Sequence, residues 1–205
     1  MRIALIHALA HSVTPINEEL ERRWPEAVRM NLLDDSLSAD LARNGAGLDA
    51  SMHQRFEDLT AYAERTGARA ILFTCSAFGP CIEAAAARRP HMPVLKPNEA
   101  MVADAVAHGG RVGLIASFGP TLESMPPEFP HDTELATRLA DGALEALNQG
   151  DTERHDALVI EAAQRLADQG CDVIALAQFS MARAQMAVHR AVGLPVLTTP
   201  GSAVR

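Results

Sequence analysis

The feature that most constrains this chain is an internal repeat. Three pairs of segments match in the same order: residues 2–6 with 111–115, residues 67–71 with 170–174, and residues 93–96 with 195–198. The separations of 109, 103 and 102 residues are similar, and each segment joins an apolar run to a turn. A period this long predicts two lobes of similar structure rather than a solenoid of short repeats.

Short apolar runs alternate with longer segments of helical periodicity, a pattern typical of a parallel sheet with helices on both faces. Strands are expected at residues 3–6, 27–32, 70–73, 94–95, 112–116, 173–176 and 196–197, and helices at 51–66, 79–89, 98–108, 133–148, 151–169 and 182–192. Gly67 and Gly170 are expected to follow helix ends in a left-handed conformation, which suits glycine.

The predicted fold class is therefore α/β, with two lobes related by a pseudo-twofold axis. Each lobe is expected to be a mostly parallel sheet flanked by helices, the first formed by residues 1–97 plus 199–205 and the second by residues 98–198. The active site is expected in the cleft between them. The proline-rich segment 124–132 is either a lid over that cleft or a plain connection.

The composition of the chain limits the kinds of molecule that it is expected to bind. The net charge of −8 over 205 residues argues against a nucleic-acid surface or an anionic membrane, because such surfaces need clustered cations. A small molecule is the expected partner. Three cysteines are too few for a disulfide framework, which favours a reducing cytoplasm, and no apolar run approaches the roughly 20 residues that span a bilayer.

The strongest catalytic candidate is Cys75, which follows a predicted strand and precedes a predicted helix. The positive end of a helix dipole and nearby backbone N–H groups favour thiolate at such a position. The repeat puts Gln178 in the equivalent place, so one half carries a thiol and the other an amide. Cys81 and Cys171 are expected to be packing residues.

Loops that leave the carboxyl ends of parallel strands form the ligand crevice of such folds. The expected substrate-binding residues on these loops are His7, His11, Ser12, Thr74, Ser76, Ser117, Thr121, Phe179 and Ser180. Ordinary helix N-caps account equally well for the hydroxyls. His7 and His11 lack an evident third ligand, so no metal site is predicted, and either could bind a carboxylate or assist proton transfer.

Other histidines, His53, His108, His155 and His189, are expected on solvated helix faces. The chain has no G-x-G-x-x-G, no P-loop lysine motif and no G-x-S-x-G elbow. These are the usual marks of nucleotide cofactors and of hydrolase triads, so neither is predicted.

Together these features resemble the aspartate/glutamate/hydantoin racemase superfamily, over essentially the whole chain. Thr74-Cys75-Ser76 resembles its first catalytic turn, and Ala177-Gln178-Phe179 stands where many members have Gly-Cys-Thr. Ser117 and Thr121 look like the family's hydroxyls, and residues 31–37 resemble a segment found in other members. The resemblance implies catalysis without a cofactor, on small carboxylates or hydantoins, and a homodimer.

Members of that superfamily with two thiols use one to remove an α-proton and the other to deliver a proton from the opposite face. Gln178 cannot do this, because an amide neither gains nor loses a proton near neutrality. One thiol suits other chemistry: Cys75 could protonate the carbanion left when a malonate-type acid loses carbon dioxide, or add to an activated double bond or carbonyl while Gln178, as the second catalytic residue, orients the substrate. An isomerase or racemase with one cysteine is the third alternative, in which water, His7 or His11 supplies the second proton. The rival class is a ligand-binding relative without activity. Fast alkylation of Cys75 at a pH well below about 8.5, the ordinary pKa of a cysteine thiol, would favour an enzyme over a binding protein.

Overall fold

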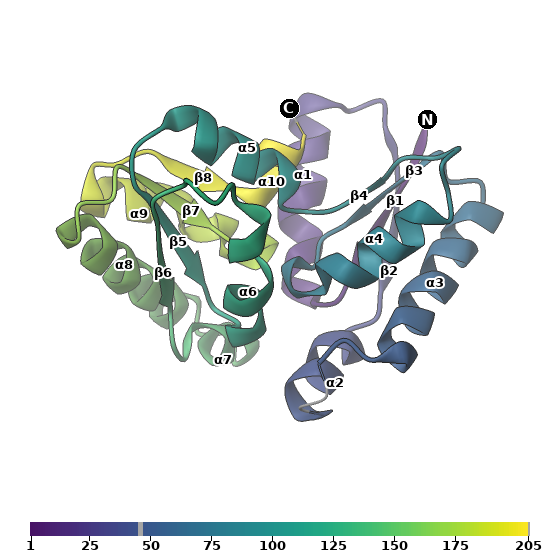
Figure 1. The fold of residues 1–205 in the computed structure, drawn as a ribbon, viewed down its shortest axis with the longest axis horizontal. Helices are drawn as coiled ribbons and strands as arrows, with labels where there is room; N and C mark the ends of the chain where they lie inside the picture. The colour runs from purple at the N-terminus through teal and green to yellow at the C-terminus, as the bar shows by residue number, and fades with distance from the viewer. Residues whose placement is uncertain (45–46, 205) are drawn as a thin grey trace. The chain divides into compact units, whose positions relative to one another are not determined.

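The computed structural model describes residues 1–44 and 47–204, and it divides them into two compact units. The first unit comprises Met1–Pro97 with Val204, and the second comprises Asn98–Ala203. Each contains one four-stranded sheet, and every strand pair in both sheets is parallel. Helices flank each sheet (Figure 1), which confirms the predicted α/β class.

The first unit has the strand order β2-β1-β3-β4. Its strands are β1 (Arg2–His7), β2 (Val28–Leu33), β3 (Ala70–Phe73) and β4 (Val94–Leu95). Its helices are η1 (Ala10–Ser12), α1 (Val13–Arg23), α2 (Ser36–Asn44), α3 (Ala50–Arg65), η2 (Ser76–Phe78) and α4 (Gly79–Ala87). The central strands β1 and β3 are almost entirely buried, and the Phe56 ring of α3 stacks on Phe73 with ring centroids 5.1 Å apart.

The second unit repeats this strand order as β6-β5-β7-β8. Its strands are β5 (Val112–Ala116), β6 (Leu135–Leu139), β7 (Val173–Leu176) and β8 (Val196–Thr198). Its helices are α5 (Glu99–His108), α6 (Gly119–Ser124), η3 (Pro126–Glu128), α7 (Ala143–Asn148), α8 (Thr152–Asp168), η4 (Phe179–Ala184), α9 (Gln185–Val192) and α10 (Thr199–Ala203).

Successive side chains along the strands of the second sheet pack alternately into two separate hydrophobic cores. Ile115, Ile174 and Leu176 pack with buried residues of α7, α8 and α9, whereas Leu114 and Ala175 pack with those of α5. Side chains of neighbouring strand residues point to opposite faces, so a run of apolar residues supplies both cores at once. This is why β5 and β7 read as continuous apolar runs in the sequence.

The pairings of the two sheets correspond residue by residue. Ile3 pairs with Ala70 in the first sheet, and Val112 pairs with Val173 in the second. These are the positions that the matched segments equate. Arg2, at the start of β1, and Arg111, just before β5, make equivalent hydrogen bonds. Each donates from Nη1 to the carbonyl of the residue that caps the C-terminus of the long helix α3 or α8.

Both long helices end in the same way. Gly67 follows α3 with φ of 85°, and its N–H donates to Glu64 O at 2.9 Å while Ala68 N donates to Ala63 O at 3.1 Å. Both bonds recur after α8, where Gly170 has φ of 81°. This pattern is the Schellman motif, and it confirms the expected role of the two glycines.

Two expectations differ from the structure. The helix expected over residues 133–148 is instead strand β6 followed by α7, because Gly142, with φ of 75°, interrupts the chain and residues 135–139 complete the sheet edge beside β5. Residues 199–205 were expected in the first lobe, but Thr199–Ala203 form α10, which packs on α5 in the second unit. Val204 belongs to the first unit as expected, and residue 205 lies outside the described residues. The helices α1, α2 and α6 were not foreseen. Among the described residues, none of the helices has the length and apolarity to cross a membrane.

Candidate active site

Cys75 lies directly after β3, in the turn that leads through η2 to α4. It caps η2 with an extended backbone and is 6% exposed. Its Sγ lies 3.6 Å from Ile6 O, the carbonyl that also accepts from Thr74 N at 2.9 Å. The backbone N–H groups of Ala8 and Thr74 and the Thr74 side chain lie close enough to the sulfur to favour its thiolate form, which lowers the pKa of Cys75. The thiol thus lies among backbone groups of the residues at and just after the ends of β1 and β3.

Burial controls the protonation of this thiol. Desolvation raises the pKa of Cys75 to about 12, and the donors from Ala8 and Thr74 offset only part of that effect. The carboxylate of Asp34 raises the pKa further. The expectation of a thiolate-favouring helix terminus is therefore corrected, because the desolvation cost of the anion exceeds the gain from nearby donors. At neutral pH Cys75 is a thiol, which suits a proton donor.

His7 lies beside this turn, at the carboxyl end of β1, and is fully buried. Its Nδ1 is 2.8 Å from Thr74 Oγ1, and its Nε2 is 2.9 Å from Asn31 Oδ1 on β2. Desolvation lowers the pKa of His7, and the hydrogen bond to Asn31 counteracts this only in part. His7 was expected to bind substrate, but both ring nitrogens are occupied by protein groups.

A cluster of charged side chains holds the segment that follows β2 in place. Asp34 N donates to His7 O at 3.0 Å, and Arg55 of α3 donates to Asp34 Oδ2 at 2.6 Å. Burial alone would raise the pKa of Asp34, but hydrogen bonds from Ser36 and Arg55 bring it below its usual value. Arg55 therefore balances the one carboxylate that acts on Cys75. The sequence analysis named this segment only through the resemblance.

The remaining candidates of the first unit lie around the same sheet edge. His11 is partly exposed in η1, and Ser12 is 3% exposed at the start of α1. Ser76 is buried at the start of η2. Cys81 is buried in α4, where desolvation raises its pKa to about 11. Within the described part of the chain, no three His, Cys, Asp or Glu side chains are placed to hold a metal ion.

In the second unit, Gln178 occupies the turn after β7 that corresponds to Cys75. Its Oε1 accepts from Ser117 N at 2.6 Å and from Ser117 Oγ at 3.2 Å. Both residues are buried, with exposures of 8% and 7%. Gln178 therefore joins the loops after β5 and β7, and its carbonyl oxygen is already used by two donors of the protein.

Three hydroxyls of the second unit are buried without a hydrogen-bond partner among the described residues. They belong to Thr121 in α6, Ser180 in η4 and Thr199 in α10, with exposures of 1%, 2% and 0%. These elements follow β5, β7 and β8, so all three lie at the carboxyl edge of the sheet. Buried hydroxyls normally have partners, and three unpaired donors at one edge indicate a place for ligand oxygens. Thr199 was not among the expected binding residues, although it lies just after the expected strand 196–197.

The last candidate, Phe179, is fully buried next to Gln178. His155 lies in α8 and, contrary to expectation, is fully buried, with Nδ1 2.7 Å from Asp156 Oδ1. The helical periodicity of that segment did not distinguish its core face from its solvated face at this position. Cys171 is buried in the core beside β7, as expected of a packing residue.

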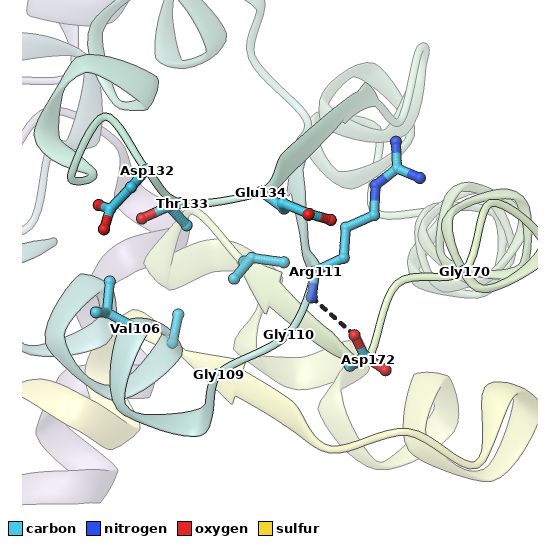
Figure 2. A pocket seen from close by; sticks show the side chains of 11 residues that line it. Val106, Gly109, Gly110, Arg111, Asp132, Thr133, Glu134, Gly170 and Asp172 are labelled. Atoms are coloured by element: carbon cyan, nitrogen blue, oxygen red, sulfur yellow. Dashed lines mark hydrogen bonds between the residues drawn. The ribbon is translucent and has the colours of Figure 1, made fainter.

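A pocket of about 540 Å³ lies at the opposite, amino-terminal edge of the second sheet. Figure 2 shows its lining, in which Arg111 N donates to Asp172 Oδ2 at 2.7 Å. Glu134 and Asp132 supply further carboxylates on the lining. None of the sequence-predicted site residues lines this pocket. The candidate catalytic groups and this hollow therefore belong to different ends of the strands.

The sequence profile of the Asp/Glu/Hydantoin racemase family matches residues 10–205, so the chain belongs to this family. Among curated proteins no sequence matches it. Solved structures that share its fold include a glutamate racemase from Bacillus anthracis, at 12% identity and a TM-score of 0.76, covering 98% of this chain and 78% of that one.

Two further structures extend the range of known activities on this fold. An allantoin racemase from Pseudomonas fluorescens is 17% identical with a TM-score of 0.70, covering 100% of this chain and 88% of its own. A variant of arylmalonate decarboxylase is 18% identical with a TM-score of 0.65, and the match covers 99% of this chain and 90% of that one. At these identities the likeness concerns the fold, and it confirms the two-sheet α/β architecture.

Proposed function

We propose that this protein is a cofactor-independent enzyme that transfers a proton to or from carbon in a small carboxylate or hydantoin-like substrate, with Cys75 as the acting acid and base. The observation that supports this most directly is the pair of equivalent turns after β3 and β7. Only the first carries a titratable side chain at the central position, a buried thiol whose Sγ lies 3.6 Å from Ile6 O. Family membership supports an isomerisation or racemisation.

The protonation state of Cys75 determines whether it first donates or first accepts a proton. With a pKa of about 12 the thiol is protonated at rest, so it can give its proton to a carbanion or enediolate-like intermediate. The Ala8 N–H and the Thr74 side chain lower the pKa of Cys75 and so favour the thiolate that remains. In the reverse direction this thiolate would remove a proton from the substrate carbon.

A second candidate reaction is decarboxylation of a malonate-type acid. Loss of carbon dioxide leaves an electron pair on the substrate carbon, and the Cys75 S–H bond breaks as its proton moves to that carbon. This reaction needs one acid and no second base, so Gln178 is no obstacle. The raised pKa of Cys75 favours it, as does the likeness of the fold to arylmalonate decarboxylase.

The hydroxyls of Thr121, Ser180 and Thr199 are proposed to bind an anionic group of the ligand. Each can donate one hydrogen bond to a carboxylate oxygen, and each is buried without a protein partner among the described residues. A small anionic molecule is therefore the proposed partner. A ligand-binding protein without activity would use the same hydroxyls but would have no use for the thiol.

The test incubates the protein in deuterium oxide with amino acids, hydantoins, maleate and substituted malonates, and follows deuterium uptake and products by proton NMR. Cys75→Ser should abolish turnover, because a serine hydroxyl is a far weaker acid than a thiol. Cys171→Ala, which removes a buried packing cysteine, is the control and should retain turnover. An unchanged rate in Cys75→Ser would refute the role of Cys75.

The same panel separates an enzyme from a binding protein. Thermal stabilisation by one of these compounds, without exchange or product in the wild type, would identify a binding protein and reject the enzyme. Ser180→Ala should weaken binding of the active compound by about ten- to a hundredfold, because one charge-assisted hydrogen bond contributes about 1.5–3 kcal/mol. Unchanged binding in this variant would reject the anion site.

A further inference from the structure

The side-chain amide of Gln178 has a single orientation. One of its two polar atoms lies 2.6 Å from Ser117 N, and because a backbone N–H can only donate, that atom must be the carbonyl oxygen Oε1. The Ser117 hydroxyl donates to the same oxygen at 3.2 Å. Turning the amide over would bring two donors together and leave the buried Ser117 N–H without an acceptor. The positions of Oε1 and Nε2 are therefore fixed.

The internal repeat explains the position of this oxygen. The separation of 109 residues that matches β1 with β5 equates Ala8 with Ser117, just as the later turns equate Cys75 with Gln178. In the first unit, the Ala8 N–H favours the thiolate of Cys75. In the second unit, the equivalent N–H donates to Gln178 Oε1. A neutral carbonyl oxygen thus takes the hydrogen bond that would otherwise favour a charged sulfur.

The nitrogen of the same amide has a different environment. Gln178 Nε2 has no acceptor among the described residues, although the residue is only 8% exposed. It is also absent from the fully enclosed unpaired atoms of the described chain, so it is accessible to solvent. An amide nitrogen carries two hydrogens and cannot accept a hydrogen bond. Beyond the turn, Gln178 therefore offers a donor and no acceptor.

This donor lies at the same edge of the second sheet as the three unpaired hydroxyls. Ser180 follows Gln178 by two residues in η4, and α10, which carries Thr199, packs on η4. Thr121 is in α6, the helix that follows the loop of Ser117. A hydroxyl can donate or accept, so the three hydroxyls alone do not select between an oxyanion and an N–H group of a ligand. The Gln178 nitrogen does select, because it can only donate.

We propose that Gln178 determines the class of ligand, and that this class is a carboxylate rather than a hydantoin. The inference rests on the proposed function, which leaves both classes open. A carboxylate has two oxygens with about four acceptor sites and no donor, so every donor at this edge finds a partner. A hydantoin ring alternates carbonyl and N–H groups. An N–H group facing Gln178 Nε2 would lose its own partner in a largely buried place, which weakens binding.

The proposal gives the turn after β7 a role that a second thiol would not have. A thiol there could exchange a proton with the substrate, whereas the Gln178 amide holds an oxyanion and keeps its own hydrogens. The binding role also accounts for the length of the side chain, whose oxygen reaches Ser117 while its nitrogen stays available. This agrees with a reaction that needs only one acid.

Replacing Gln178 by glutamate separates the roles of the two amide atoms. Gln178→Glu keeps the length of the side chain and an oxygen for Ser117, but it replaces the donor by a second, negatively charged acceptor. Binding is measured by isothermal titration calorimetry at about pH 8, where a carboxyl group of ordinary pKa is ionised. The carboxylate probes are malonate, phenylmalonate, maleate and both enantiomers of aspartate and glutamate, and hydantoin is the N–H probe.

The wild type should bind at least one of these carboxylates more tightly than hydantoin. Gln178→Glu should weaken binding of that carboxylate by about a hundredfold, because a charge-assisted hydrogen bond is lost and a like charge is added. It should not weaken hydantoin. Ser117→Ala keeps the N–H bond that orients the amide and should keep the preference for the carboxylate.

The matched control is Gln169→Glu, which adds the same charge to an exposed glutamine of the second unit. Gln169 lies at the opposite edge of the sheet, where its carbonyl accepts from Arg111, so every affinity should stay unchanged. Unchanged carboxylate binding in Gln178→Glu would overturn the proposal. So would a wild type that binds hydantoin most tightly, or one that binds none of the carboxylates.

Nitrogen-15 NMR of the side-chain amides tests the contact in the wild type, without relying on the fold of a variant. The Gln178 Nε2 resonance, assigned through its own backbone, should shift when the bound carboxylate is added, and that of Gln169 should not. A carboxylate that binds and leaves the Gln178 resonance in place would reject the proposed hydrogen bond.

None of these measurements requires turnover. Carboxylate binding that depends on Gln178, in a protein that converts no compound, would retain this inference and reject the enzyme. Turnover of a hydantoin that depends on Cys75, with no carboxylate bound, would retain the enzyme and reject this inference.

Discussion

The hydrogen bonds between Gln178 and Ser117 give a sharp test of the turn that replaces the second thiol. Replacing Gln178 by methionine keeps the length of the side chain and removes its acceptor. The Ser117 N–H, now 2.6 Å from Gln178 Oε1, would lose its partner in a position where Ser117 is only 7% exposed. The Ser117 hydroxyl is less affected, because it can rotate toward another acceptor.

The expected cost follows from that one buried donor. An unsatisfied buried N–H costs about 1–3 kcal/mol, so Gln178→Met should lower the free energy of unfolding by about 2 kcal/mol. Ser117→Ala is the matched variant, because it removes only the 3.2 Å hydroxyl bond and keeps the N–H bond. Its expected cost is smaller, about 0.5–1.5 kcal/mol, the range for one typical hydrogen bond.

Urea denaturation measures both free energies, and amide hydrogen exchange reports the Ser117 N–H itself. In Gln178→Met the protection of this amide should fall more than that of the core amides of β5. If Gln178→Met were as stable as the wild type, or if Ser117 kept its protection, the turn would not depend on this bond. Gln178 would then be available to a ligand, and its assignment as a structural link would be wrong.

Two further predictions concern stability in each unit. Arg89→Met should cost about 2–3 kcal/mol, since the buried guanidinium pairs with two glutamates of α3, while the exposed Arg88→Met should cost under about 0.5 kcal/mol. The pKa values of those two glutamates are lowered, so the loss of unfolding free energy in Arg89→Met should be full at neutral pH and should shrink below about pH 4.5 as the glutamates protonate. A loss that stays constant over this pH range would contradict the role of the ion pairs. Gly110→Ala should cost about 2–3 kcal/mol more than Gly109→Ala in thermal melts, because both have φ of 74° but only at Gly110 would a Cβ collide with the Asp172 carboxylate, which accepts from Arg111 N. Equal melting temperatures for the two would refute the contact.

Much of the fold could be read from local patterns. The buried strands β1, β3, β5 and β7 were predicted nearly to the residue, because a strand covered on both faces is a continuous apolar run. Gly67 and Gly170 marked two helix ends, because a left-handed residue after a helix favours glycine. The edge strand β6 was misread as helix. Its side chains are only partly buried, so its conformation is set by pairing with β5 and not by its own sequence.

The candidate site, like the fold, could be predicted from the sequence only in part. The sequence by itself determined that a thiol and an amide occupy equivalent turns, since both follow apolar runs that the repeat aligns. Only the tertiary structure decided the protonation of that thiol, because desolvation depends on atoms brought together from β1, β3 and their loops. The same holds for His7: its place at the end of a strand was evident, but its hydrogen-bond partners Thr74 and Asn31 meet it only in the folded chain.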